Sequence, residues 1–231
     1  MKKVLSAWCI QLSLVVVCIL SVNSPAFAFT LNVEDKDAPA DVRDEVKEKL
    51  SGKVHQISGD GEPFFEFWFA KTVELNAIAK TMKDMLENLD EIALLGVIVV
   101  HDNEERFDFR EDPIDPGTYV MRMSLQPQDG NHMGTSPFDT FALLVPQDRD
   151  EEVVEIDDPE EMVDIASEHT IAEHPPILSL QPLENAEGEF PRLTHDEEED
   201  WYFLVIELPA TADGEPTKLN LNLVFEGIGD L

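Results

Sequence analysis

The feature that most constrains the fold is a period-two alternation of apolar and polar residues in short segments of the chain. It is clearest from Leu219 to Phe225, where every second residue is leucine or phenylalanine and asparagine fills two of the three positions between them. Successive side chains of a β-strand point to opposite faces, so this pattern predicts a strand with one buried face. Residues 119–125 repeat the pattern, with Tyr119, Met121 and Met123 on one side.

Turns rich in proline and glycine separate segments of this kind along most of the chain. The predicted strands cover residues 53–58, 64–69, 94–100, 106–110, 119–125, 138–145, 177–180, 201–208 and 219–225. Apolar residues at helical spacing predict helices over residues 39–51, 77–90 and 158–169, whereas residues 29–38 are polar and predict no regular structure. Strands and helices do not alternate regularly. We therefore expect a mainly β fold, an antiparallel β-sandwich of about eight strands with two or three peripheral helices.

The charge of the chain limits its partners. The 231 residues include 49 acidic and 16 basic side chains, which gives a formal net charge of −33. A hydrophobic content of 43% is too high for a disordered acidic tail, so we expect these charges on the surface of a folded domain. Such a surface repels phosphate backbones and anionic lipid headgroups, which excludes basic-patch binding to nucleic acid.

The first 28 residues have the layout of a secretory signal peptide. Two lysines at positions 2 and 3 precede an apolar stretch, and Ala26-Phe27-Ala28 places small residues at the −3 and −1 positions of a cut. The sequence thus predicts cleavage after Ala28, export to the periplasm or the extracellular medium, and no membrane span after cleavage. The rest of the chain, residues 29–231, is expected to be a single acidic β-rich domain. The alternative, an uncleaved membrane anchor, is disfavoured because the apolar stretch is short and interrupted by Gln11 and Ser13.

Both cysteines, Cys9 and Cys18, lie inside this predicted leader. The exported chain would therefore contain no thiol, which rules out disulfides, cysteine nucleophiles and cysteine-ligated zinc. Neither Gly-x-Ser-x-Gly nor Ser-x-x-Lys occurs, and no glycine-rich phosphate loop is present. Acidic pairs are abundant through composition alone and single out no glycosidase site.

The most unusual segment is the predicted loop 127–137, which packs Asp129, Asn131, His132 and Met133 into five positions. Asp129 and Asn131 offer oxygen ligands of the kind that calcium prefers, and His132 and Met133 offer softer donors suited to copper. The sequence requires no cofactor, and a loop built from turn-forming residues is the alternative reading. Weaker candidates for calcium are the acidic groups at 101–105, at Asp112 with Asp115, and at 196–200, none of which matches the EF-hand spacing.

One stretch resembles an uncharacterised family of exported bacterial proteins. The shared pattern is Pro-Gly-x-Tyr at 116–119, then Gln-Pro-x-Asp-Gly-Asn-His at 126–132, then an apolar strand ending at Val145. The aromatic segment 65–69 and the segment around His174-Pro175 look like further parts of it. The resemblance implies an exported bacterial β-rich protein and carries over no activity and no site residue.

Taken together, these features predict a non-catalytic β-sandwich that binds or scaffolds a partner outside the cytoplasm. The first alternative is an exported metal-binding protein that uses the loop at 129–133. The second is a hydrolase with an acidic pair.

Overall fold

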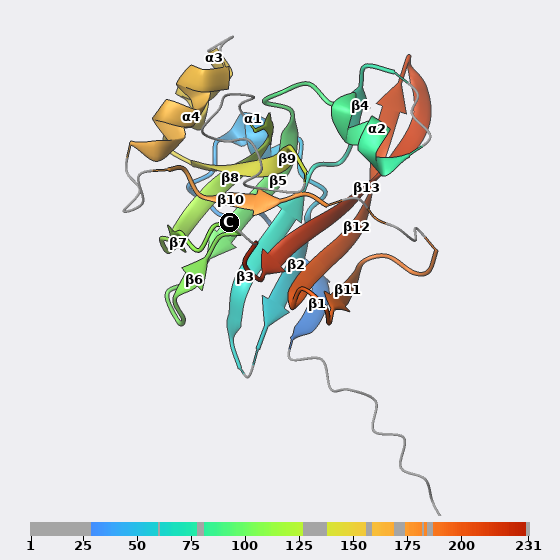
Figure 1. The fold of residues 1–231 in the computed structure, drawn as a ribbon. Helices are drawn as coiled ribbons and strands as arrows, with labels where there is room; N and C mark the ends of the chain where they lie inside the picture. The colour runs from blue at the N-terminus through green and yellow to red at the C-terminus, as the bar shows by residue number, and fades with distance from the viewer. Residues whose placement is uncertain are drawn as a thin grey trace, which may run out of the picture.

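The computed structural model describes residues 29–59, 61–77, 81–126, 138–155, 159–168, 174–181, 183 and 187–229. Over these residues the chain forms thirteen strands and four short helices. The expected fold class is confirmed: the protein is mainly β, with antiparallel sheets that pack as a sandwich and helices at the periphery (Figure 1).

Seven strands form the larger sheet, and each pairs antiparallel with its neighbours. In spatial order they are β1 (Thr30–Asp35), β2 (Lys53–Ser58), β3 (Pro63–Phe69), β5 (Leu94–Val100), β8 (Gly117–Leu125), β9 (Thr140–Pro146) and β10 (Ile177–Ser179).

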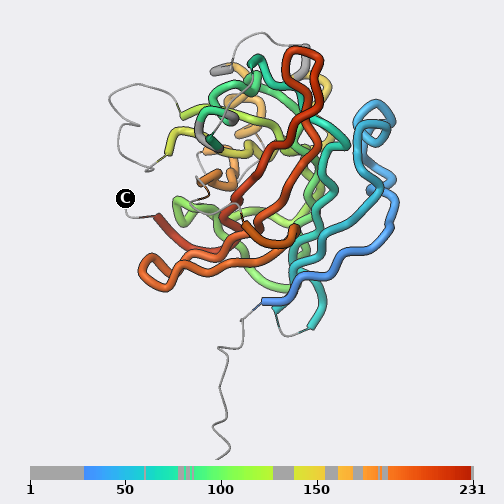
Figure 2. The backbone as a smooth tube through the Cα atoms, turned by 90° about the vertical axis from the view of Figure 1, so that its right-hand side faces the viewer, coloured from blue at the N-terminus to red at the C-terminus, as the bar shows by residue number. Residues whose placement is uncertain are grey.

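The smaller sheet is dominated by a long hairpin that packs on one face of the larger sheet. Its strands are β11 (Arg192–Asp196), β12 (Trp201–Ala212), β13 (Glu215–Glu226) and the short β4 (Val73–Leu75), which pairs with β12 in parallel. Figure 2 shows the first strands, in blue and cyan, beside this orange and red hairpin. Between the sheets lies the main core, where rings from β3 such as Phe65 and Phe67 join leucines from β13 such as Leu221.

The other face of the larger sheet is covered by short elements rather than by a second sheet. Helix α1 (Asp44–Lys47) places Val46 on Trp68 and Val97, while α3 (Asp150–Glu155) and α4 (Pro159–Ser167) cover the outer side of β9 and β10. Helix α2 (Met82–Glu87) lies by β4 and the far end of the hairpin, and β6 (Arg106–Phe107) pairs with β7 (Pro113–Ile114) (Figure 1).

Some local differences from the expected elements have clear physical reasons. Residues 29–38 are not irregular: β1 is an edge strand held by main-chain bonds to β2, and its exposed polar side chains hide it from a search for apolar alternation. The helix expected over 39–51 shrinks to α1, although Val42, Val46 and Leu50 do share one buried side. Strand β11 is missed because it lies at an edge and is only half-buried.

Candidate functional site

The predicted metal-binding residues Asp129, Asn131, His132 and Met133 lie outside the described residues. The structure does fix the two ends of their loop. Leu125 of β8 is paired with Thr140 of β9, and the amide of Gln126 donates to the carbonyl of Asp139 at 2.7 Å. The loop therefore joins two adjacent strands at one end of the larger sheet, and its metal binding stays a prediction.

Two of the acids in the weaker calcium candidates make local contacts in the described part of the chain. The carboxylate of Asp196 accepts the amides of Glu198 and Glu199 at 2.9 and 3.3 Å, which closes the turn before β12. The carboxylate of Asp112 faces Arg110 at 3.7 Å. Across the residues that the structure covers, no three His, Cys, Asp or Glu side chains are placed to hold a metal ion.

Strand β3 contains Glu66, the charged residue at the centre of the candidate site. Phe65, Phe67 and Phe69 face the smaller sheet, and Trp68 faces the opposite side with the α1 segment. Glu66 shares the outer face with Trp68, and it is the one acidic residue in this strand. In register with it lie Gln56 of β2, Val99 of β5 and, one strand further, Thr118 of β8.

The carboxylate of Glu66 is nearly buried, with 7% of the side chain exposed, yet it is well partnered. Its Oε1 atom accepts hydrogen bonds from Lys36 Nζ at 2.6 Å and from Gln56 Nε2 at 2.7 Å. The Oε2 atom lies 3.4 Å from His101 Nε2. Burial by itself would raise the pKa of Glu66, but the hydrogen bonds from Lys36 and Gln56, with the nearby positive charge, hold that pKa below its usual value. Glu66 is therefore an anion at neutral pH.

A hollow of about 290 Å³ opens above this carboxylate. Its floor is the sheet, with Glu66, Val99 and Thr118, and Trp68 stands at the side. The opposite wall comes from the segment that follows β1; in full, the lining residues are Lys36, Asp37, Pro39, Glu66, Trp68, Val99 and Thr118. Apolar side chains beside a small number of charged and polar groups are the usual composition of a small-ligand site, and the volume is at the lower end for such sites.

Two contacts hold Lys36 in this wall. The indole Nε1 of Trp68 donates to the carbonyl of Lys36 at 2.9 Å, and the amide of Lys36 donates to the carbonyl of Gly52 at 3.2 Å. The main chain of Lys36 is thus tied to the sheet. Its ammonium lies 5.5 Å from the centre of the Trp68 ring, within the range of a cation–π contact, and its side chain is 44% exposed.

A buried ion network lies near the start of α1, on the same face of the larger sheet as the hollow. Asp150, at the start of α3, is fully buried and receives Arg122 of β8 through two bonds, at 2.6 and 3.0 Å. Arg43, just before α1, donates to the same carboxylate at 2.7 Å. This network ties the start of α1 to α3 and to β8.

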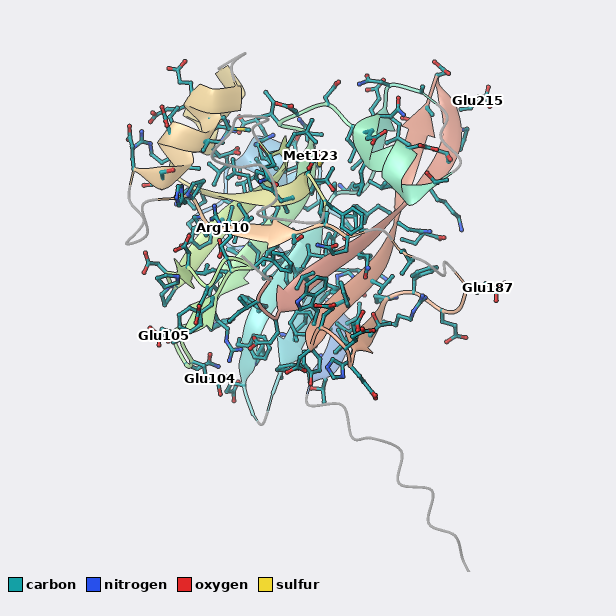
Figure 3. All side chains as sticks on the ribbon, viewed as in Figure 1. Glu104, Glu105, Arg110, Met123, Glu187 and Glu215 are labelled. Carbon is teal, nitrogen blue, oxygen red and sulfur yellow. The ribbon has the colours of Figure 1, made fainter. Side chains whose placement is uncertain are left out.

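Other charged pairs lie near the surface or serve the fold. His195 Nε2 lies 2.8 Å from Asp200 Oδ1, but the Asp200 side chain is 82% exposed. Asp108 is buried and paired with Arg110, which also donates to the carbonyl of Pro175 at 2.7 Å and so fixes the hairpin of β6 and β7 to the sandwich. Many other acids, including Glu105, Glu187 and Glu215, lie at the periphery of the protein (Figure 3).

Sequence reasoning did not find this site, because its residues are spread from Lys36 to Thr118 and form no motif. One signal was present. Glu66 stands alone between two pairs of aromatic residues, Phe64-Phe65 and Phe67-Trp68. Because such residues are usually buried, this pattern predicts a charged side chain among buried neighbours.

Helices long and apolar enough to cross a membrane do not occur in the described part of the chain. Comparison with known proteins adds no relative: no family model, no curated protein and no solved structure matches this chain. The resemblance to a family of exported bacterial proteins stays a prediction.

Proposed function

We propose that this chain is an exported, non-catalytic β-sandwich that binds a small ligand in the hollow above Glu66. The observation that carries the proposal is an ionised carboxylate, fixed by two hydrogen bonds at the floor of a hollow that Trp68 and Val99 also line. Such a group orients a ligand, and the walls remove apolar surface from water.

The state of Glu66 favours binding over catalysis. A general base works best when its pKa lies near the working pH, and the pKa of Glu66 is lowered rather than raised. Its Oε1 atom is already engaged by two donors, which leaves it poorly placed to take up a proton.

Export is supported by the position of the predicted cleavage site. A cut after Ala28 would make Phe29 the first residue, directly before β1, and every described element would be retained. The ring of Phe29 packs edge-on against Phe64, Tyr202 and Phe225, with centroid distances of 4.8–5.6 Å. N-terminal sequencing of the protein recovered from outside the cytoplasm should read Phe-Thr-Leu; an intact leader would contradict export by cleavage.

A thermal-shift screen of small charged molecules tests the binding function. Compounds that bind the hollow should raise the melting temperature of the protein made without its predicted leader (residues 29–231, called the trimmed protein below). They should lose this effect in Glu66→Gln. The matched control is Glu215→Gln, which removes a similar charge from the exposed start of β13. Hits that act equally on both variants, or no hits at all, would overturn a site at Glu66.

Metal binding by residues 129–133 is the second candidate. The donor set Asp129, Asn131, His132 and Met133 supports it, as does the attachment of the loop to two paired strands. Calorimetry of the trimmed protein with calcium and with copper tests it. Stoichiometric binding should disappear in the double variant Asp129→Ala, His132→Ala, and binding unchanged by that variant would rule the loop out.

A further inference from the structure

We infer that the ligand of the hollow is a small aliphatic amine, and that the ammonium of Lys36 is an internal competitor for the same place. This inference rests on the proposed function and names its ligand class. The geometry points to it because the contacts that Lys36 makes with Glu66 and Trp68 are those that a free alkylammonium ion would make.

The charges around the hollow select a cation. Two carboxylates line it, those of Glu66 and Asp37, against one ammonium. When Lys36 withdraws, the lining carries two negative charges, and a chain with a net charge of −33 adds a long-range attraction for cations. An anionic ligand would meet repulsion from the floor of the site.

A simple metal ion fits the hollow less well than an amine does. Hard divalent cations need several oxygen ligands that converge on one point. Among the described residues no group of three ionisable donors does so. The indole of Trp68 and the side chains of Val99 and Pro39 instead offer apolar contact for methylene groups next to a charged head.

Lys36 can leave while its surroundings stay in place. Its main chain is held by Trp68 and Gly52, so withdrawal involves only rotation of the side chain. That side chain is 44% exposed, so the ammonium can turn into solvent, and the long side chain regains rotamer freedom when it does so. Gln56, which bonds the same oxygen of Glu66, would remain to orient the carboxylate.

The volume limits the size of the amine. A hollow of about 290 Å³ takes a short chain and leaves a larger ligand outside. Two sources share this chemistry: a free diamine, and a lysine side chain presented by a partner protein. Two probes separate them, 1,4-diaminobutane and lysine blocked as its N-acetyl methylamide, with 1-butanol as the uncharged control.

Calorimetry of the trimmed protein with these probes tests the inference. We expect weak amine binding to the natural protein, binding that is several-fold to about tenfold tighter in Lys36→Met, and none in Glu66→Gln. Preference for the diamine would assign a free amine, and preference for the blocked lysine would assign a partner side chain. Equal binding of 1-butanol, or no gain in Lys36→Met, would overturn the inference.

A second measurement avoids dependence on variants that fold poorly. The trimmed protein would contain two tryptophans, Trp68 at the hollow and Trp201 at the end of the smaller sheet. Titration of the natural protein with 1,4-diaminobutane and with the blocked lysine should shift the indole N–H resonance of Trp68, in at least one of the two titrations, and leave that of Trp201 in place. No shift at Trp68 with either amine would overturn the amine assignment. Hits from the charged-molecule screen that depend on Glu66 but contain no amine would then leave the binding function standing with another ligand class.

Discussion

The two faces of the larger sheet are built differently, although the same strands supply both. The inner face meets a second sheet and is filled by large apolar side chains such as Phe65, Phe67 and Leu144. The outer face is covered by three short helices and their connections, and it buries charged groups, among them Glu66 and Asp150. Because the inner face can supply most of the stability, the outer face is free to hold polar groups where a ligand can reach them.

The contrast is sharpest along β3 itself. Phe67 and Phe69 stack on the inner side with a centroid distance of 5.7 Å and an interplanar angle of 4°. Glu66, which precedes Phe67, and Trp68, which lies between the two phenylalanines, line the hollow on the other side of the sheet. A single strand thus contributes to the core with one set of side chains and to the candidate site with the other.

The largest expected effect is on the inner face. Phe67→Ala should lower the free energy of unfolding by about 3–5 kcal/mol, because it removes a fully buried ring between two neighbouring rings. Urea unfolding of the trimmed protein measures this. The partner experiment is Val99→Ala on the outer face, where the half-buried side chain should cost about 1 kcal/mol. Equal losses of stability in the two variants would show that the inner face does not contribute more than the outer face.

Next in size is the buried network of the outer face. Asp150→Asn should destabilise the protein by about 3 kcal/mol, because Arg122 and Arg43 would lose the negative charge that they surround. The same unfolding assay applies, with the exposed Asp148→Asn as its control. A loss as small as that of the control would mean that the network does not hold α1 and α3 to the sheet.

A smaller effect should appear as a pH dependence that originates on the inner face. Burial lowers the pKa of His55, which packs edge-on against Phe69 at 5.2 Å, so the folded protein holds this ring neutral. The unfolded chain binds the proton more readily, so stability falls as the pH drops below the ordinary histidine value of about 6.5 and on through the lowered pKa, by at most about 1.4 kcal/mol per pH unit.

Unfolding curves of the natural protein and of His55→Leu at several pH values isolate this contribution. The difference between the two proteins should shrink or reverse as the pH falls, because only the natural protein must release a proton to fold. A constant difference across that pH range would show that His55 does not titrate on unfolding.

The smallest effect is expected at the surface. Lys218 Nζ lies 2.6 Å from Glu207 Oε1 on the hairpin of the smaller sheet, but the Lys218 side chain is 68% exposed. Lys218→Ala should change the free energy of unfolding by no more than about 0.5 kcal/mol. A loss above about 1 kcal/mol would show that exposed ion pairs contribute more to the stability of this acidic protein than they do in most proteins. The surface would then count as a third source of stability beside the two faces of the larger sheet.

The fold was largely accessible from the sequence because the strands that build the core carry their burial in their own pattern. The alternation from Leu219 to Phe225 lies within β13, and the apolar run from Leu94 to Val100 is β5, a central strand covered on both faces. The edge strands β1 and β11 have no such signature. The polar residues of β1 are ordered by the neighbouring main chain of β2, which local sequence does not describe.

The candidate site was not accessible in the same way. Glu66 meets Lys36 only because β1, β2 and β3 lie side by side, and Thr118 joins them only because β5 and β8 follow in the sheet. Strand order is a property of the whole chain, so a site assembled across five strands produces no fixed spacing in the sequence. The segment 129–133 could be proposed as a metal site from the sequence for the opposite reason, because its possible donors are adjacent in the chain.

The exposed strand β1 at the end of the larger sheet has a consequence for how copies of the protein behave when crowded. A bare edge invites another chain to extend the sheet, but here Glu34 and Asp35 close the strand and Asp37 follows it, all three exposed. Two such edges brought together would set like charges face to face, so we expect concentrated preparations to resist fibril formation.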